Sequence, residues 1–135
     1  MRQLGVLVLA CGLLLALTGC GNSSDALPSQ VRFRLRPSTP SEPPVRLEIT
    51  SAAAVDEAEA LLESGEGRWA VGAIRPGDGG FNAPWHWHLD PATVSFAEVT
   101  IEACQATPTY IDQTLDYWIA FGRVCIGAII EGRER

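Results

Sequence analysis

Two histidines and an aspartate in the segment WHWHLD, residues 85–90, have the types and spacing of metal ligands. On a β-strand, side chains two positions apart point to the same face, so His86, His88 and Asp90 would lie together. Two imidazoles and a carboxylate form a ligand set that suits zinc or iron. One hypothesis is therefore a metal-binding or metal-dependent hydrolytic protein that uses this His-x-His-x-Asp strand.

The same alternation also fits a structural role, which we favour. In this interpretation Trp85 and Trp87 pack into the core, while the two imidazoles face solvent or bond to neighbouring backbone. A metal centre would need further ligands from elsewhere in the chain, and Glu98 and Glu102 qualify only if their strand lies alongside. We therefore predict no resident metal or other cofactor, and the metal site is the alternative.

Composition limits the other kinds of chemistry. The chain has 135 residues, a hydrophobic fraction of 47% and a formal net charge of −6, which fits one small folded domain and disfavours a nucleic-acid partner. All ten basic residues are arginine, so mechanisms that need a lysine are excluded. The sequence also lacks the Ser-His-Asp order, the nucleophile elbow and the phosphate-binding loop. It therefore does not support an enzyme.

The N-terminus has the pattern of an export signal. Arg2 precedes an apolar run at 4–17, which is long enough for a signal peptide and too short for an ordinary membrane span. The run ends in Leu17-Thr18-Gly19-Cys20, which resembles the lipobox of bacterial lipoproteins. We predict a signal peptide at 1–19, lipid attachment at Cys20 and a location in the cell envelope, where acyl chains hold the protein on the extracytoplasmic face of a membrane. The alternative is a chance cysteine after a cleaved signal.

The remaining cysteines predict a disulfide. Cys11 leaves with the signal and Cys20 takes the lipid, so Cys104 and Cys125 are left in the mature domain. In an exported protein two such cysteines favour a bond, and closing this loop would stabilise the fold by roughly 3 kcal/mol. Two isolated thiols are the alternative.

Serine and proline dominate the next segment, 20–44, which we interpret as a tether between lipid and domain. Within it, apolar and basic residues alternate, which also fits a short extra edge strand or a basic patch against anionic lipid. These residues are Val31, Arg32, Phe33, Arg34, Leu35 and Arg36.

The folded domain is predicted at 45–135. Ser51 is a candidate N-cap and Gly65 a candidate terminator of the first helix, and Thr107 before Pro108 opens the second. We interpret the order of elements as the split β-α-β (ferredoxin-like) pattern of an α+β domain, with a small antiparallel sheet and two helices on one face. Strands are predicted at 45–49, 69–74, 85–89, 94–104 and 124–131, and helices at 52–63 and 108–118.

The segments GGFNAPWHWHLDP (79–91) and FAEVTIEAC (96–104) carry a family resemblance. They resemble an uncharacterised small domain that occurs at the N-terminus of calmodulin-binding vesicle proteins and alone in bacterial secreted proteins and lipoproteins. The resemblance extends over about 46–131. Gln105 stands where that family commonly has Asp, and Ile126-Gly127 where it has Pro-Trp. The resemblance implies no activity, and the basic amphipathic helix that calmodulin binds is missing from this chain.

These observations favour a membrane-anchored lipoprotein whose exported domain is a non-catalytic binding module for an unknown protein or small ligand. The loop PGDGGFNAP, residues 76–84, is the candidate partner-binding loop, with Phe81 and Asn82 as contact residues. The alternative for Phe81 is an aromatic ring that packs back onto the domain.

Overall fold

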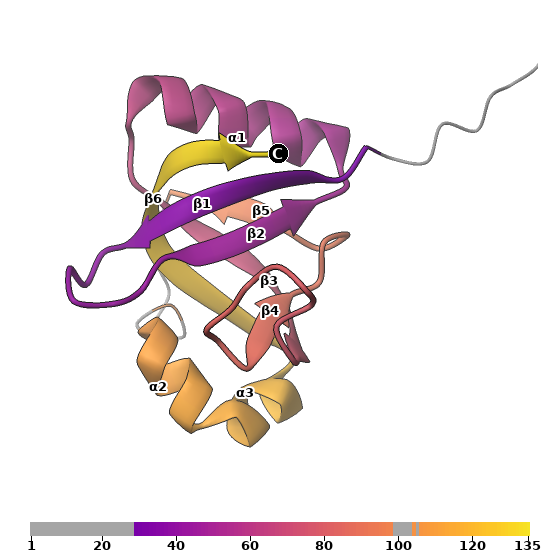
Figure 1. Ribbon diagram of the computed structural model, residues 1–135, viewed down its shortest axis with the longest axis vertical. Coiled ribbons are helices and arrows are strands. Elements are labelled where there is room, and N and C mark those ends of the chain that lie inside the picture. Colours follow the sequence, from indigo (N-terminus) through magenta and orange to yellow (C-terminus); the bar gives the residue numbers. More distant parts are fainter. Residues whose placement is uncertain (1–28, 99–103, 105) are drawn as a thin grey trace, which may run out of the picture.

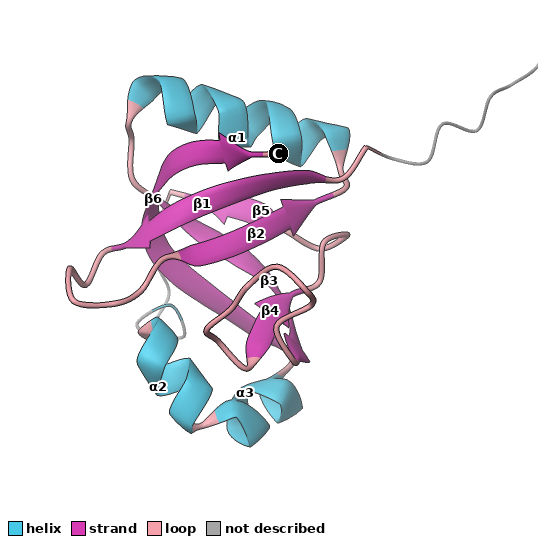
Figure 2. Ribbon diagram, viewed as in Figure 1, coloured by secondary structure: helices cyan, strands magenta, loops and turns pink. Residues whose placement is uncertain are grey.

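The computed structural model describes residues 29–98, 104 and 106–135, and within them the chain forms six strands and three helices. All strand pairs are antiparallel, in the order β2-β1-β6-β3-β4, and β5 also pairs with β3 (Figures 1 and 2). In chain order the elements are β1 (Val31–Pro37), β2 (Val45–Ile49), α1 (Ala52–Ser64), β3 (Arg68–Pro76), β4 (Trp87–Leu89), β5 (Ser95–Ala97), α2 (Pro108–Gln113), α3 (Leu115–Phe121) and β6 (Arg123–Glu134).

The predicted ferredoxin-like arrangement is wrong. The sheet curls almost into a barrel, and its helices lie at opposite ends of it: α1 packs against β6, β5 and β2, whereas α3 packs against β3 and β6 (Figure 1). The inner side of the curved sheet is filled by its own side chains, with Trp87, Phe33 and Leu47 fully buried. Because the sheet covers itself, it needs no layer of two helices on one face.

The main cause of this difference is β1, which lies in the segment predicted as a tether. Val31, Phe33 and Leu35 are 5%, 0% and 1% exposed, so the alternation reports a strand with one buried face. The strand is not at an edge, because it pairs with β2 on one side and β6 on the other. The tether prediction therefore fails for residues 31–37, and the folded region includes them.

The arginines on the outer face of β1 are paired with glutamates. Arg32 Nε lies 2.8 Å from Glu48 Oε2, and Arg34 and Arg36 approach the two carboxylate oxygens of Glu131 at 3.4 and 3.2 Å. Cross-strand pairs of opposite charge stabilise a sheet modestly. The alternative of a basic patch against lipid is thus weakened, since glutamates accompany the arginines.

The first helix begins and ends as predicted. Ser51 Oγ accepts a hydrogen bond from the Ala54 backbone N–H, which satisfies an otherwise unpaired donor of the first turn. Gly65 adopts φ 68° and its N–H donates to the Leu61 carbonyl, a left-handed terminator that glycine adopts without strain.

The second predicted helix is divided into α2 and α3 at Thr114. Thr107 caps α2 as predicted, because its hydroxyl accepts from the Tyr110 N–H. Thr114 Oγ1 donates to the Tyr110 carbonyl at 2.6 Å and accepts from Trp118 Nε1 at 3.1 Å. A hydroxyl that bonds backbone and side chain locally competes with the regular helix ladder, and Thr114 leaves helical geometry with φ −125° and ψ 35°.

The disulfide between Cys104 and Cys125 is confirmed, with the two Cα atoms 4.6 Å apart. It ties the start of the segment that carries α2 and α3 to strand β6. Of the strand predicted at 94–104, the structure describes β5 at Ser95–Ala97, and residues 99–103 lie outside the described part of the chain.

Candidate functional site

The three predicted metal ligands have separate partners. His86 Nδ1 lies 3.0 Å from Asp112 Oδ2, and His88 Nδ1 lies 2.7 Å from the Gly77 carbonyl oxygen. Asp90 Oδ2 accepts from the Arg75 guanidinium at 2.8 and 3.1 Å.

Glu98, the proposed further ligand, pairs with Arg68 at 3.1 Å, and Glu102 lies outside the described residues. Within residues 29–98, 104 and 106–135, no group of three His, Cys, Asp or Glu side chains is arranged to hold a metal ion. The structure thus does not bring His86, His88 and Asp90 together as a metal centre.

The strand predicted at 85–89 is shorter in the structure, because β4 covers only Trp87–Leu89, but the expected burial of the tryptophans is confirmed. Trp85 and Trp87 are 6% and 0% exposed, while the His86 side chain is 81% exposed and His88 is half-buried. Trp85 Nε1 donates to the Pro44 carbonyl at 3.0 Å, so the polar end of this buried ring has a hydrogen-bond partner. The alternation therefore serves packing, as we favoured.

Two groups beside this strand, His86 and Asp90, have shifted pKa values. Asp112 accepts from the His86 ring and also from the His86 backbone N–H at 2.7 Å. The hydrogen bond and the negative charge of Asp112 raise the pKa of His86 above its usual value. The hydrogen bonds that Asp90 accepts from Arg75 and from the Ala92 N–H lower the pKa of Asp90. His86 thus joins the β4 side of the molecule to α2.

The predicted partner-binding loop is wrong, because its contact residues are buried. Phe81 is 8% exposed; its ring lies 5.6 Å below the Arg32 guanidinium and meets the His88 ring edge to face at 5.5 Å. Gly79 and Gly80, with φ 65° and 79°, let the chain turn so that this ring points inward. Phe81 instead packs back onto the domain, which was the alternative for this residue.

Asn82 is fully buried and joins two strands that do not pair directly. Its Oδ1 accepts from the Arg46 N–H on β2 at 2.7 Å, and its Nδ2 donates to the Trp87 carbonyl on β4 at 2.8 Å. The amide therefore spans the gap between the two ends of the sheet, and nearby the Thr50 N–H donates to the Pro91 carbonyl. We call this contact the Asn82 clasp; its role is structural.

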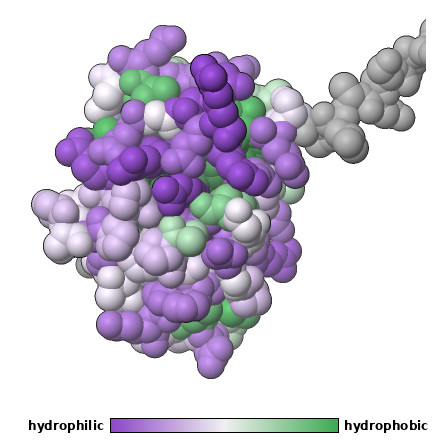
Figure 3. Space-filling model, in the orientation of Figure 1, coloured by the Kyte–Doolittle hydropathy of each residue, from purple (hydrophilic) through white to green (hydrophobic). Residues whose placement is uncertain are grey.

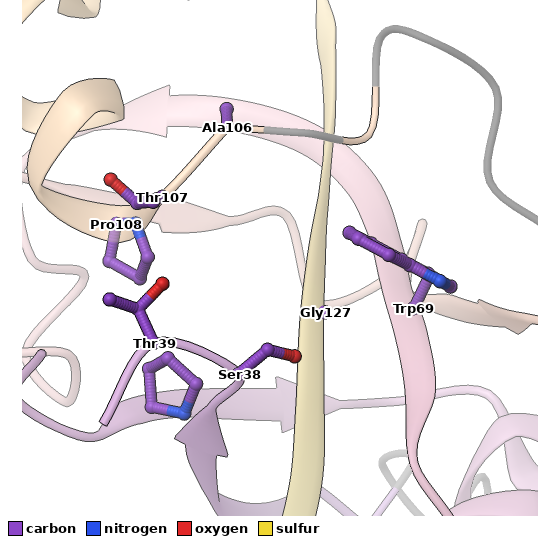
Figure 4. A pocket seen from close by; sticks show the side chains of 8 residues that line it. Ser38, Thr39, Trp69, Ala106, Thr107, Pro108 and Gly127 are labelled. Carbon is purple, nitrogen blue, oxygen red and sulfur yellow. The ribbon is translucent and has the colours of Figure 1, made fainter.

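A small hollow lies where β1, β3, β6 and the start of α2 meet, and it has a volume of about 70 Å³. Figure 4 shows the Ser38, Thr39 and Thr107 hydroxyls on one side of the β6 ribbon and Trp69 on the other. A Cβ at Gly127 would lie 2.8 Å from Ser38 Oγ and 3.0 Å from the Trp69 ring, so only glycine fits between them. The hollow has room for a few water molecules and is smaller than the sites that hold organic substrates.

Exposed apolar side chains gather on α2 and α3. Of the described residues, the large hydrophobic ones classed as exposed all fall within 110–121: Tyr110 (51%), Tyr117 (60%), Ile119 (37%) and Phe121 (56%). In Figure 3 a green patch lies at the lower end of the molecule, where Figure 1 places α3, and purple surface borders it. Clustered exposed apolar residues on a small domain are typical of interaction sites.

The rings at this site form one connected cluster around Trp118, which is itself only 6% exposed. Tyr117 and Tyr110 meet Trp118 at 82° and 85°, with centroids 5.1 and 6.3 Å away. Phe121 meets it at 86° and lies nearly parallel to Tyr117, at 13°. We call Tyr110, Tyr117, Trp118 and Phe121 the aromatic face. Edge-to-face packing holds the exposed rings in fixed orientations.

Two side-chain contacts hold α2 against the sheet beneath the aromatic face. Glu42, in the loop between β1 and β2, accepts from the Thr109 hydroxyl at 2.6 Å and from the Thr109 N–H at 3.2 Å. Asp112 is held by His86. These contacts fix α2, which carries Tyr110, while α3, which carries the other three rings, packs against β3 and β6.

Sequence reasoning missed this site. It predicted one helix at 108–118, but the structure has two helices that meet at Thr114, with Trp118 buried and Tyr110 51% exposed. Tyr117 and Phe121 are four residues apart, a spacing that places two aromatic rings on one side of a helix and could have indicated the surface.

Within the described ranges, no helix is long and apolar enough to cross a membrane. The fold and the surface define a small domain made mainly of antiparallel sheet, in which a disulfide fixes a helical segment with exposed aromatic rings. The chain belongs to the BP-74 N-terminal domain family, whose sequence profile matches residues 29–127. The match begins two residues before β1 and so includes the strand that the tether prediction had left out. Neither the curated proteins nor the solved structures contain a match to the chain.

Proposed function

We propose that this protein is a lipid-anchored, non-catalytic binding module of the bacterial cell envelope, and that the aromatic face is its binding surface. The observation that carries the proposal is the grouping of exposed aromatic side chains on two adjacent helices, α2 and α3. Tyrosine and phenylalanine present large contact areas with few rotatable bonds, which favours their use in recognition.

The anchor rests on the lipobox-like sequence that ends at Cys20. Eleven positions separate Cys20 from Val31, the first residue of β1. A chain of that length spans at most about 40 Å, so acylation at Cys20 would keep the domain close to the membrane surface. The position suits capture of envelope partners next to the bilayer.

The binding surface is tested by affinity capture from native membranes with the acylated protein as bait. Tyr117→Ser and Phe121→Ser remove exposed rings, and Ile119→Ser is the matched control because it removes an exposed apolar side chain outside the aromatic face. We expect bands captured by the wild type to be lost with the two ring variants and retained with the control. Capture that is equal for all three variants would contradict the assignment of the surface.

The anchor is tested separately. Cys20→Ser should abolish acylation and release the domain from the membrane fraction, as followed by mass spectrometry and fractionation. Unmodified Cys20 in the wild-type protein, or cleavage after a different residue, would rule out the lipoprotein interpretation while leaving the binding surface open to test.

A further inference from the structure

The aromatic face lies in an acidic part of the molecule. The segment 108–122, which forms α2, α3 and the residue after them, contains Asp112 and Asp116 and no lysine or arginine. Asp112 is held by His86, whereas Asp116 is exposed and forms no ion pair with any described residue. Arg123 follows directly and is the nearest arginine in sequence.

Acidic groups also border α2 from neighbouring elements. Glu42 bonds the first turn of α2, and the Asp78 carboxylate is close enough to His86 to help raise its pKa. Together with Asp112 and Asp116 these are four carboxylates on or beside the two helices, against His86 beside α2 and Arg123 directly after α3. The surroundings therefore repel an anionic surface, such as a membrane rich in acidic lipid, and attract positive charge.

The exposed rings suit the same kind of partner. The face of an aromatic ring attracts a guanidinium or ammonium group, and the effect is about two- to five-fold in affinity at an exposed site. Tyr117 and Phe121 are 60% and 56% exposed and nearly parallel, one helical turn apart. Asp116 is exposed in the first turn of α3, next to Tyr117 in sequence, so its negative charge adds to the electrostatic attraction of a cation to this end of the molecule.

We propose that the aromatic face binds a basic segment of a partner protein, with arginine or lysine side chains over Tyr117 and Phe121 and balanced by Asp116. This inference rests on the proposed function, because it specifies the partner of the same surface. Charge complementarity and ring exposure together distinguish this partner from an acidic lipid surface and from an uncharged ligand.

The test uses an Arg-Gly repeat peptide as the probe and a citrulline-Gly repeat of the same length as its uncharged control. The reporter is the NMR resonance of the Trp118 indole N–H, because the Trp118 ring contacts both Tyr117 and Phe121. This N–H donates to Thr114 Oγ1 at 3.1 Å. We expect the arginine peptide to shift this resonance saturably, more weakly as salt rises. The citrulline peptide should have little effect.

Variants then locate the contact. Tyr117→Ser and Phe121→Ser should each weaken binding by about two- to five-fold, and Asp116→Asn by up to about five-fold. Ile119→Ser should leave the affinity unchanged, which separates this surface from general attraction to an acidic protein.

Three results would overturn the proposal. Equal binding of the citrulline peptide would mean that the surface recognises an uncharged partner, and the proposed function would survive. A shift of Trp118 with phosphatidylglycerol vesicles and none with the arginine peptide would assign the face to lipid. Arginine-peptide binding that persists in both ring variants would place the contact elsewhere.

Discussion

We expect the Asn82 clasp, which joins β2 to β4, to make a measurable contribution to the free energy of unfolding. Asn82 is 0% exposed, and its side chain bonds the Arg46 N–H and the Trp87 carbonyl. In Asn82→Ala both of these backbone groups lose their partner. An unpaired buried donor or acceptor costs about 1–3 kcal/mol. Water entering the vacated space would recover part of this, so we expect a loss of about 2–4 kcal/mol in the free energy of unfolding.

The measurement is urea unfolding followed by tryptophan fluorescence, with the wild type and the variant at the same pH. For a small domain the expected loss moves the midpoint by roughly 1–2 M urea. Gln113→Ala is the control, because it removes an amide of similar chemistry from an exposed position on α2. The control should change the free energy of unfolding by less than about 0.5 kcal/mol. If Asn82→Ala reduces this free energy by no more than the control does, the amide does not hold the sheet closed.

A second substitution at the same position separates the lost donor from lost packing. Asn82→Asp keeps the shape and the acceptor for the Arg46 N–H, but an ionised carboxylate cannot donate to the Trp87 carbonyl. Burial raises the pKa of the introduced carboxyl group above its unfolded value of about 3.9, so the protonated form favours the folded state. The deficit relative to wild type should therefore be small below about pH 4 and should grow as the pH rises. A deficit independent of pH would show that packing alone is affected.

Three further predictions concern the strand with the histidines and the disulfide. Trp87→Ala should reduce the free energy of unfolding by about 3–5 kcal/mol, whereas His86→Ala should leave it nearly unchanged; equal losses in urea unfolding would contradict the assigned faces. Asp112→Asn should lower the pKa of His86 toward about 6.5, as measured by an NMR titration. Because Asp112 raises this pKa, the contact between His86 and Asp112 stabilises the folded state below about pH 6.5. This stabilisation is lost as the pH rises through the raised pKa. Reduction of Cys104–Cys125 should lower the melting temperature, consistent with roughly 3 kcal/mol from loop closure, and an unchanged melting temperature would mean that the bond constrains little.

Local features of the chain could be predicted because their causes are local. The Ser51 cap and the Gly65 terminator act within one turn of α1, and the alternation at Trp85 and Trp87 follows from the two faces of a strand. The disulfide could be predicted because the expected loss of Cys11 and acylation of Cys20 leave two cysteines to pair. In each case the physical reason involves few residues.

The overall arrangement and the candidate surface depend on contacts distant in sequence. The alternation at Val31, Phe33 and Leu35 is the same for an isolated edge strand and for a strand between two partners, and the pairing with β6 at the other end of the chain decides between them. The same limit explains Asn82, which the sequence presents as a polar loop residue beside Phe81. Its burial becomes visible only when β2 and β4 are brought to either side of it.

The position of β6 has a consequence for how the domain acquires its fold. This strand comes last in the chain, yet it lies between β1 and β3 and bonds to both. Before it arrives, the β1–β2 hairpin and β3 with its short partners are separate pieces with no shared sheet. Native pairing thus depends on contacts between distant parts of the chain, such as Arg32 with Glu134, a topology that slows folding. A nascent or translocating chain that has not yet released its final strand should remain open to chaperones and proteases, and it should become resistant in a single late step.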